Sequence, residues 1–144
     1  MKIEIYQPQA IWELGQRNNQ EDSIFPAFGE ATDDDRLFIL CDGMGGHEHG
    51  EVASQTVCKA MSDTLLSLSK QSFTDDDLLD ALQTAYRQLD CLDNSHLRKM
   101  GTTLCLLYFH QGGLTAAHIG DSRIYHIRPK ENRILYQSRD HSLV

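Results

Sequence analysis

The sequence is poor in proline, tryptophan and cysteine and has no long apolar run, and an abundance of such features would assign a protein directly to a structural class. Its 144 residues include three prolines, one tryptophan and four cysteines, and no two cysteines form a Cys-x-x-Cys pair. The longest uncharged apolar run, Leu104 to Phe109, is far shorter than the roughly 20 residues that a membrane-spanning helix needs. We therefore expect neither a disulfide framework nor a membrane span.

Basic residues are also scarce, because 13 Lys and Arg face 21 Asp and Glu and the net charge is -8. This excess of negative charge disfavours attraction to nucleic acid or to an anionic membrane, so neither is an expected partner. The residues from Met1 to Glu4 lack the apolar region typical of a secretory signal. With 40% hydrophobic and 24% charged residues, the sequence predicts one cytoplasmic globular domain over residues 1–144.

The cysteines and histidines raise the question of metal binding by soft ligands. Because their neighbours are apolar, we interpret all four cysteines as reduced thiols in the core. They are Cys41, Cys58, Cys91 and Cys105. Among seven histidines only His47 and His49 are close neighbours. A zinc site built on these two and a cysteine is an alternative, but the residue spacing does not indicate the further ligands that zinc would need.

Apolar patterns predict two groups of strands on either side of two helices. Extended segments around Ile3, Ile5, Ile11 and Trp12 precede predicted strands over 23–28, 37–41, 102–110, 114–119, 123–128 and 133–137. Apolar residues at three- and four-residue steps predict a first helix from about Glu48 to Ser69. This order favours an α+β fold with helices packed on a sheet over alternating βαβ units.

The acidic triplets have structural explanations. Thr74 followed three residues later by Asp77 is a capping box, which predicts the start of a second helix. The acidic side chains there also suit the positive end of the helix dipole. We expect the other triplet, Asp33 to Asp35, to form a solvated hairpin turn.

Other acidic residues follow apolar runs and are candidates for cation binding. The run Phe38 to Cys41 leads directly into Asp42-Gly43, and a carboxylate at the end of a buried strand needs a cationic partner. The Gly43 carbonyl could coordinate a hard metal. A glycine turn with a surface aspartate is the alternative interpretation of this stretch.

Two further acidic segments suggest phosphate chemistry. Glu21 and Asp22 offer oxygen ligands for Mg2+ or Mn2+, and the guanidinium of Arg17 can grip phosphate oxygens bidentately. Asp121 stands in a tight turn, Gly120 to Arg123, between apolar runs. For the segment with Arg17 and Asp22, the alternative is an exposed ion pair. For the segment Gly120 to Arg123, the alternative is a turn without a chemical role.

Taken together, these segments resemble the metal-dependent type 2C protein serine/threonine phosphatases in their compact bacterial form. The first matching motif is Gly15-x-Arg17 followed by Asn19-Gln20-Glu21-Asp22, and the others are Asp42-Gly43-Met44-Gly45-Gly46-His47, Gly101-Thr102-Thr103, Gly120-Asp121-Ser122-Arg123 and Asp140-His141-Ser142. Five motif regions in the expected order cover residues from about 10 to the end. The resemblance implies an antiparallel β-sandwich flanked by helices, in an αββα arrangement, with two Mg2+ or Mn2+ ions at one end.

The resemblance also implies the ligands of these ions. Asp42 would bridge the two metals, and the Gly43 carbonyl would be a further ligand. Either Asp22 or Glu21 would complete the ligation, directly or through water, and the sequence does not decide between them. Asp121 would help to hold a third, weaker ion.

The reaction implied is hydrolysis of phosphoserine and phosphothreonine in proteins by a metal-bridging hydroxide. Arg17 would bind the substrate phosphate, and Arg17 and Asp42 would be the catalytic residues. A serine/threonine kinase or its targets would be partners. Many eukaryotic relatives carry a histidine directly after the Asp-Gly pair, where this sequence has Met44, so we assign no general-acid role to His47.

Members of that family normally continue with further aspartate ligands, and none follows Asp140-His141-Ser142. We therefore expect a single phosphatase-like domain that is truncated at its C-terminal side, with weak metal affinity and little or no activity. A non-catalytic binding or regulatory module is the alternative. An incomplete sandwich would leave sheet edges exposed, which predicts self-association.

Overall fold

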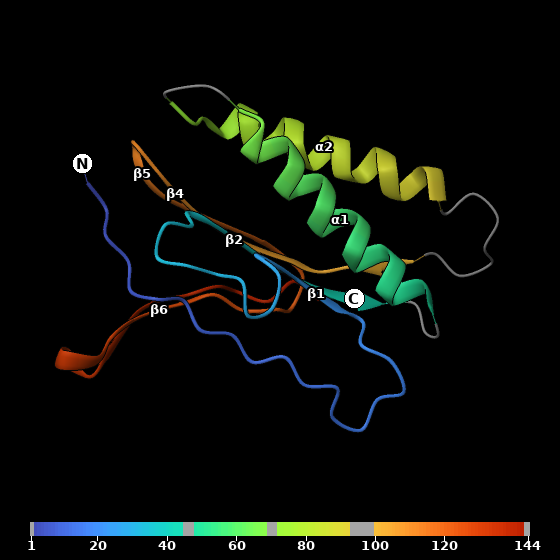
Figure 1. Ribbon diagram of the computed structural model, residues 1–144, viewed down its shortest axis with the longest axis horizontal. Helices are drawn as coiled ribbons and strands as arrows, with labels where there is room; N and C mark the ends of the chain where they lie inside the picture. The colour runs from blue at the N-terminus through green and yellow to red at the C-terminus, as the bar shows by residue number, and fades with distance from the viewer. Residues whose placement is uncertain (1, 45–47, 69–71, 93–99, 143–144) are drawn as a thin grey trace.

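The computed structural model describes residues 2–44, 48–68, 72–92 and 100–142, and arranges them in layers (Figure 1). Two helices cover one face of a five-stranded antiparallel sheet, and a two-stranded ribbon lies on the other face. The elements are β1 (Asp22–Phe25), β2 (Leu37–Met44), α1 (Glu48–Leu66), α2 (Asp75–Leu92), β3 (Gly101–Thr102), β4 (Leu104–His110), β5 (Gly113–Ile119), β6 (Tyr125–Arg128), a 3-10 turn (Pro129–Glu131) and β7 (Arg133–Gln137). The predicted α+β class with antiparallel strands is confirmed.

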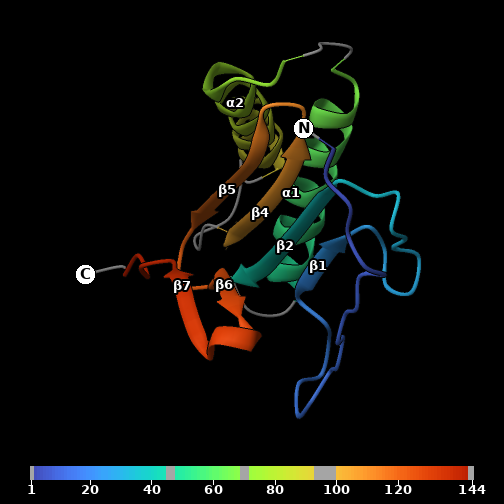
Figure 2. The ribbon, with the colours of Figure 1, turned by 90° about the vertical axis from the view of Figure 1, so that its left-hand side faces the viewer.

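The main sheet has the order β1-β2-β4-β5, and Figure 2 shows these four strands side by side. The short β3 pairs with the end of β2, where Gly43 lies opposite Thr102. Within the described part of the chain, strands β6 and β7 pair only with each other. The longest central strand, β2, therefore ends where β1 begins and where β3 joins, and this end of the sheet carries the candidate site.

The core lies between β2 and α1. Inward positions of β2 alternate with outward ones, so Leu37, Ile39 and Cys41 are buried while Leu40 and Asp42 are exposed. The buried residues pack in one cluster with α1, including Met61, which has no exposed surface. Each such large side chain contributes about 1.5–3 kcal/mol through burial. The packing fixes the first turn of α1 beside the end of β2.

The second helix begins as its capping box predicts. The Thr74 backbone N–H donates to Asp77 Oδ2 at 2.9 Å, and the Asp77 backbone N–H donates to Thr74 Oγ1 at 3.3 Å. The Asp33–Asp35 segment forms the expected turn, in which Asp35 Oδ2 accepts the Thr32 backbone N–H at 2.7 Å. Both acidic triplets thus serve local structure.

The described segment 2–14 contains no helix and joins no sheet, and Trp12 packs edge-on against Phe28 with ring centroids 6.1 Å apart. Two predicted strand boundaries need correction. Strand β1 ends at Phe25 rather than at residue 28, since Pro26 has no N–H to continue the ladder. Strand β6 begins at Tyr125 because the Ile124 N–H is taken by a side chain, as described below.

The cysteines were predicted to lie in the core, and this is wrong for one of them. Cys41, Cys58 and Cys105 are buried, but Cys91 is exposed near the end of α2. The buried face of that helix contains Ala81 and Ala85, and a residue at position 91 falls outside this 3.6-residue repeat. None of these four described cysteines takes part in a disulfide.

Among the described residues, neither long helix combines the length and the apolar character required to cross a bilayer.

Candidate metal centre

The centre of the site is a pair of carboxylates on neighbouring strands. Asp22, the first residue of β1, lies directly opposite Asp42 of β2. The Gly43 backbone N–H donates to the Glu21 carbonyl at 3.1 Å and fixes this register. Like charges directly opposite each other destabilise a sheet. Their juxtaposition at the end of the sheet is favourable only when a cation or a proton compensates it.

The electrostatics of Asp42 show which predicted residues gather there. Its pKa is raised above the ordinary value, first because the surrounding protein displaces water, then because of the charge of Asp22 and a hydrogen bond with it. The negative charge of Asp121 raises the pKa further, and the positive charge of Arg17 lowers it. Three residues singled out in the sequence, at positions 17, 22 and 121, therefore influence one carboxyl group.

The Glu21 carboxylate, just before β1, lies beside the first turn of α1. A Cβ atom placed on Gly50, in the first turn of α1, would stand 2.6 Å from Glu21 Oε2, so the Glu21 carboxylate lies against the start of the helix. Backbone N–H groups at a helix start carry partial positive charge and favour an anion. The structure thus brings Asp22, rather than the Glu21 carboxylate, to Asp42.

The approach of β2 to α1 depends on two glycines. A Cβ atom on Gly43 would stand 2.0 Å from the Gly50 carbonyl oxygen, far inside any contact distance. Gly43 is itself buried. A glycine is therefore required at position 43 for steric reasons, independently of any role of its carbonyl group.

A buried threonine connects Asp42 with the turn that carries Asp121. Thr103 Oγ1 accepts the Asp42 backbone N–H at 3.0 Å, and the Thr103 backbone N–H donates to the Asp42 carbonyl at 2.9 Å. The same hydroxyl is 2.7 Å from Ser122 Oγ. From the sequence we expected Thr103 and Ser122 to support the turns rather than to react, and these contacts connect Thr103 both with Asp42 and with the Asp121 turn.

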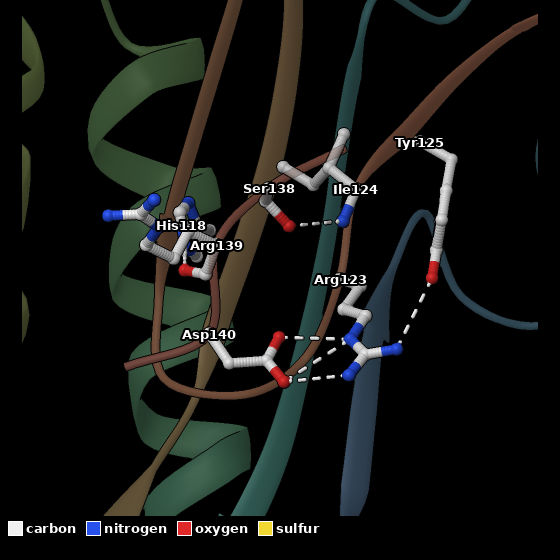
Figure 3. A network of polar contacts seen from close by, with 7 residues as sticks. All are labelled: His118, Arg123, Ile124, Tyr125, Ser138, Arg139 and Asp140. Atoms are coloured by element: carbon white, nitrogen blue, oxygen red, sulfur yellow. Dashed lines mark hydrogen bonds and ion pairs between the residues drawn. The ribbon is translucent and has the colours of Figure 1, made fainter. Parts of the chain in front are cut away.

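The chain after β7 returns to the Asp121 turn, and Figure 3 shows the contacts. Arg123 and Asp140 form a two-pronged ion pair, with Nε 2.9 Å from Oδ1 and Nη2 2.8 Å from Oδ2. The guanidinium lowers the pKa of the Asp140 carboxyl. Ser138 Oγ accepts the Ile124 backbone N–H at 2.9 Å. We call residues 138–141 the C-terminal strap.

Two histidines, His118 of β5 and His141 of the C-terminal strap, join the strap to the rest of the fold. The Gly120 backbone N–H donates to His141 Nδ1 at 3.2 Å, and the His141 backbone N–H donates to the Gly120 carbonyl at 3.0 Å. The rings of His118 and His141 stack with centroids 4.7 Å apart. The Asp140-His141-Ser142 motif, for which the sequence suggested no role, thus braces the Asp121 turn.

The oxygen ligands at this site are of the type that a hard divalent cation binds, but they are few in number. Carboxylates and a carbonyl oxygen are ligands that Mg2+ and Mn2+ accept. Within the described ranges, no group of three or more His, Cys, Asp or Glu side chains is placed to hold a metal ion. His47 lies outside the described residues, and His49 belongs to α1, so no described cluster supports the zinc alternative.

Known protein sequences match most of this chain. The sequence model of protein phosphatase 2C matches residues 15–143. The serine/threonine protein phosphatase PstP of Mycobacterium tuberculosis is 38% identical over 125 residues, a match that covers 80% of this chain and 21% of PstP. The serine/threonine phosphatase stp of Listeria monocytogenes is 34% identical over 123 residues, covering 80% of this chain and 47% of that protein. The chain thus spans less than half the length of these relatives.

Solved structures show the same relationship. The crystal structure of M. tuberculosis PstP superimposes with a TM-score of 0.68 at 31% identity, over 95% of this chain and 53% of that one. The PstP catalytic domain in complex with two manganese ions gives a TM-score of 0.67 at 32% identity, over 90% of this chain and 52% of that one. The matched family model spans most of the sequence, and the fold agrees with that of its relatives. The chain therefore belongs to the protein phosphatase 2C family.

Proposed function

We propose that this chain carries the first part of the active site of a metal-dependent phosphatase that hydrolyses phosphoserine and phosphothreonine in proteins. The observation that carries the proposal is the pairing of Asp22 with Asp42, which lie opposite each other while the charges of Arg17 and Asp121 reach the same carboxyl. Its relatives named serine/threonine phosphatases support the substrate class.

In this proposal, Asp42 and Asp22 hold Mg2+ or Mn2+, with the Gly43 carbonyl as a further ligand and Asp121 holding an additional, weaker ion. Glu21 stays at the start of α1, and it acts on the ions only through water. Bound divalent ions stabilise negative charge on phosphoryl oxygens and lower the pKa of water. The manganese in the structure of PstP supports divalent ions of this kind.

Arg17 binds the substrate phosphate. It is exposed in the loop before β1, where its backbone N–H donates to the Leu14 carbonyl at 3.3 Å and Gly15 adopts a positive φ of 63°. Its charge already acts on Asp42, so its guanidinium lies near the proposed cation site. A guanidinium offers two parallel N–H donors to a phosphate and balances charge that develops there during hydrolysis.

Residues 1–144 form one unit in this proposal, and the remaining oxygen ligands of a complete active site come from outside the described residues. Two adjacent carboxylates hold a divalent ion weakly, so we expect weak Mn2+ binding and little or no turnover by this chain alone. A non-catalytic binding or regulatory module is the second candidate function, and the small number of metal ligands in this chain favours it. Hydrolysis of a phosphothreonine peptide by the chain would exclude that candidate.

Calorimetric titration with Mn2+ tests the metal site. Asp42→Ala should abolish the binding seen with the unsubstituted chain, while Asp90→Asn, which alters an exposed carboxylate on α2, should leave it unchanged. Equal Mn2+ binding by Asp42→Ala and the unsubstituted chain would refute the proposed site.

The partners and setting follow from the same proposal. The substrates are phosphoproteins made by a serine/threonine kinase. The free thiols suit the reducing conditions of a cytoplasm. Exposed apolar side chains on the β6–β7 ribbon, including Ile127 at 55% and Ile134 at 58% exposure, support self-association. A monomer in light scattering at high protein concentration would contradict this last point.

A further inference from the structure

We propose that Thr103 is a positioning residue that sets the spacing between Asp42 and Asp121. The inference rests on the proposed function, because both aspartates are assigned there to divalent ions. Thr103 lies between β3 and β4 with 2% of its surface exposed. Its hydroxyl group is bonded to protein atoms on two sides, so its effect on the ions is indirect.

On one side, Thr103 holds the backbone of Asp42. Its hydroxyl oxygen accepts the Asp42 N–H at 3.0 Å, and its own N–H donates to the Asp42 carbonyl at 2.9 Å. Both polar backbone groups of Asp42 are therefore bonded to a single residue. A shift of β2 at this point would break two hydrogen bonds at once.

On the other side, Thr103 contacts both residues that flank Asp121. Its hydroxyl group is 2.7 Å from Ser122 Oγ. Its methyl carbon lies so close to Gly120 that a Cβ atom there would stand 2.7 Å from it, and Gly120 also needs its positive φ of 101°. The hydroxyl and the methyl group together fix the turn from both ends.

The number of hydrogen-bond donors and acceptors in a hydroxyl group explains why threonine suits this position. A hydroxyl has one proton and two lone pairs, so it can accept the Asp42 N–H and still bond to Ser122 in either direction. Valine has the same shape but leaves the amide and Ser122 without this partner, and serine keeps the hydrogen bonds but lacks the methyl group. The two substitutions therefore separate hydrogen bonding from packing.

The C-terminal strap holds the outer side of the same turn, through the paired hydrogen bonds between Gly120 and His141 and the ion pair of Arg123 with Asp140. Thr103 connects its inner side to β2. The turn is thereby placed relative to Asp42, and the charge of Asp121 reaches the Asp42 carboxyl. The structure thus gives one side chain control over the distance between two proposed ligands on separate elements.

Calorimetric Mn2+ titration of single variants of this chain tests the proposal. Loss of a residue that orients a metal ligand typically weakens metal binding 10- to 100-fold, so we expect Thr103→Val to weaken Mn2+ binding about 10-fold or more. Thr103→Ser should remain within about threefold of the unsubstituted chain, because it restores the hydrogen bonds. The matched control is Thr115→Val, which removes a hydroxyl bonded to His110 Nε2 at 2.8 Å in the β4–β5 hairpin and should change nothing.

The outcomes separate the two proposals. Unchanged Mn2+ affinity in folded Thr103→Val, or equal weakening by the valine and serine variants, overturns the positioning role of Thr103. In that case, loss of Mn2+ binding in Asp42→Ala still supports the proposed metal site. Binding that does not depend on Asp42 overturns both. If circular dichroism shows that Thr103→Val is unfolded, Ser122→Ala is the deciding variant, because it removes only the hydrogen bond between Thr103 and the Asp121 turn. Weaker Mn2+ binding by Ser122→Ala supports the positioning role, and unchanged binding refutes it.

Discussion

The close approach of β2 to α1 makes Gly43→Ala the sharpest test of the fold around the site. The added methyl group would stand 2.0 Å from the Gly50 carbonyl oxygen and 2.7 Å from the Glu21 carbonyl oxygen. Both neighbours are backbone atoms, and neither can rotate away. Contact distances between carbon and other heavy atoms are near 3.5 Å, so the strand and the helix must separate by more than ~1 Å.

The energetic cost follows from this displacement. Overpacking a well-packed interior by one methyl group costs about 1–3 kcal/mol. Because the clash is with backbone on two sides, we expect the upper end, a loss of about 3 kcal/mol in the free energy of unfolding. The same displacement moves Asp42 relative to Asp22, so Mn2+ binding should weaken as well.

Urea unfolding followed by circular dichroism measures the effect, and Gly101→Ala is the matched control. Gly101 lies on the neighbouring strand, opposite Met44, where an added Cβ atom would make an ordinary contact of 3.6 Å with the Met44 side chain. Its free energy of unfolding should change by less than about 1 kcal/mol. If both variants unfold at the same urea concentration, the inferred steric role of Gly43 is wrong.

Three further outcomes follow from the same contacts. Since the Asp42 pKa is raised in the folded protein, its neutral form stabilises the fold at low pH, and this contribution is lost as the pH rises through the folded pKa. Asp42→Asn should therefore stabilise the metal-free protein at pH 7 by about 0.2–1 kcal/mol, an advantage that urea titrations should show shrinking toward pH 4. Asp77→Ala should cost about 1 kcal/mol because it removes the capping box of α2; thermal unfolding measures this, with the exposed Asp76→Ala as control, and equal effects would contradict it. Of the four thiols, Cys91 should react first with a thiol reagent in the folded protein, because the others are buried and burial raises the pKa of Cys105 to about 11; four equal rates would argue against the described core.

Local patterns were sufficient for the helices and for most strands. The start of α2 follows from Thr74 and Asp77, which bond to each other across a single turn. Strand β7, at Arg133–Gln137, lies where the apolar pattern placed it. The end of β1 at Phe25 and the exposure of Cys91 were not predicted, because they depend on what packs against each segment.

The candidate site shows the same division. The types and order of its residues, Arg17, Asp22, Asp42 and Asp121, are visible in the sequence because each follows or precedes an apolar run or a glycine turn. Their convergence on one carboxyl group is not visible there, because it requires strand pairing and a turn more than 70 residues away along the chain.

The sequence by itself determined the α+β class, the helices, the motifs and the excess of acidic residues, since these depend on periodicity, on composition and on neighbours within a few positions. Only the tertiary structure placed Asp22 opposite Asp42, turned Glu21 toward the start of α1, and made Thr103 the link between Asp42 and the Asp121 turn. The physical reason is that register and close packing are set by contacts between segments distant in sequence, which no local pattern encodes.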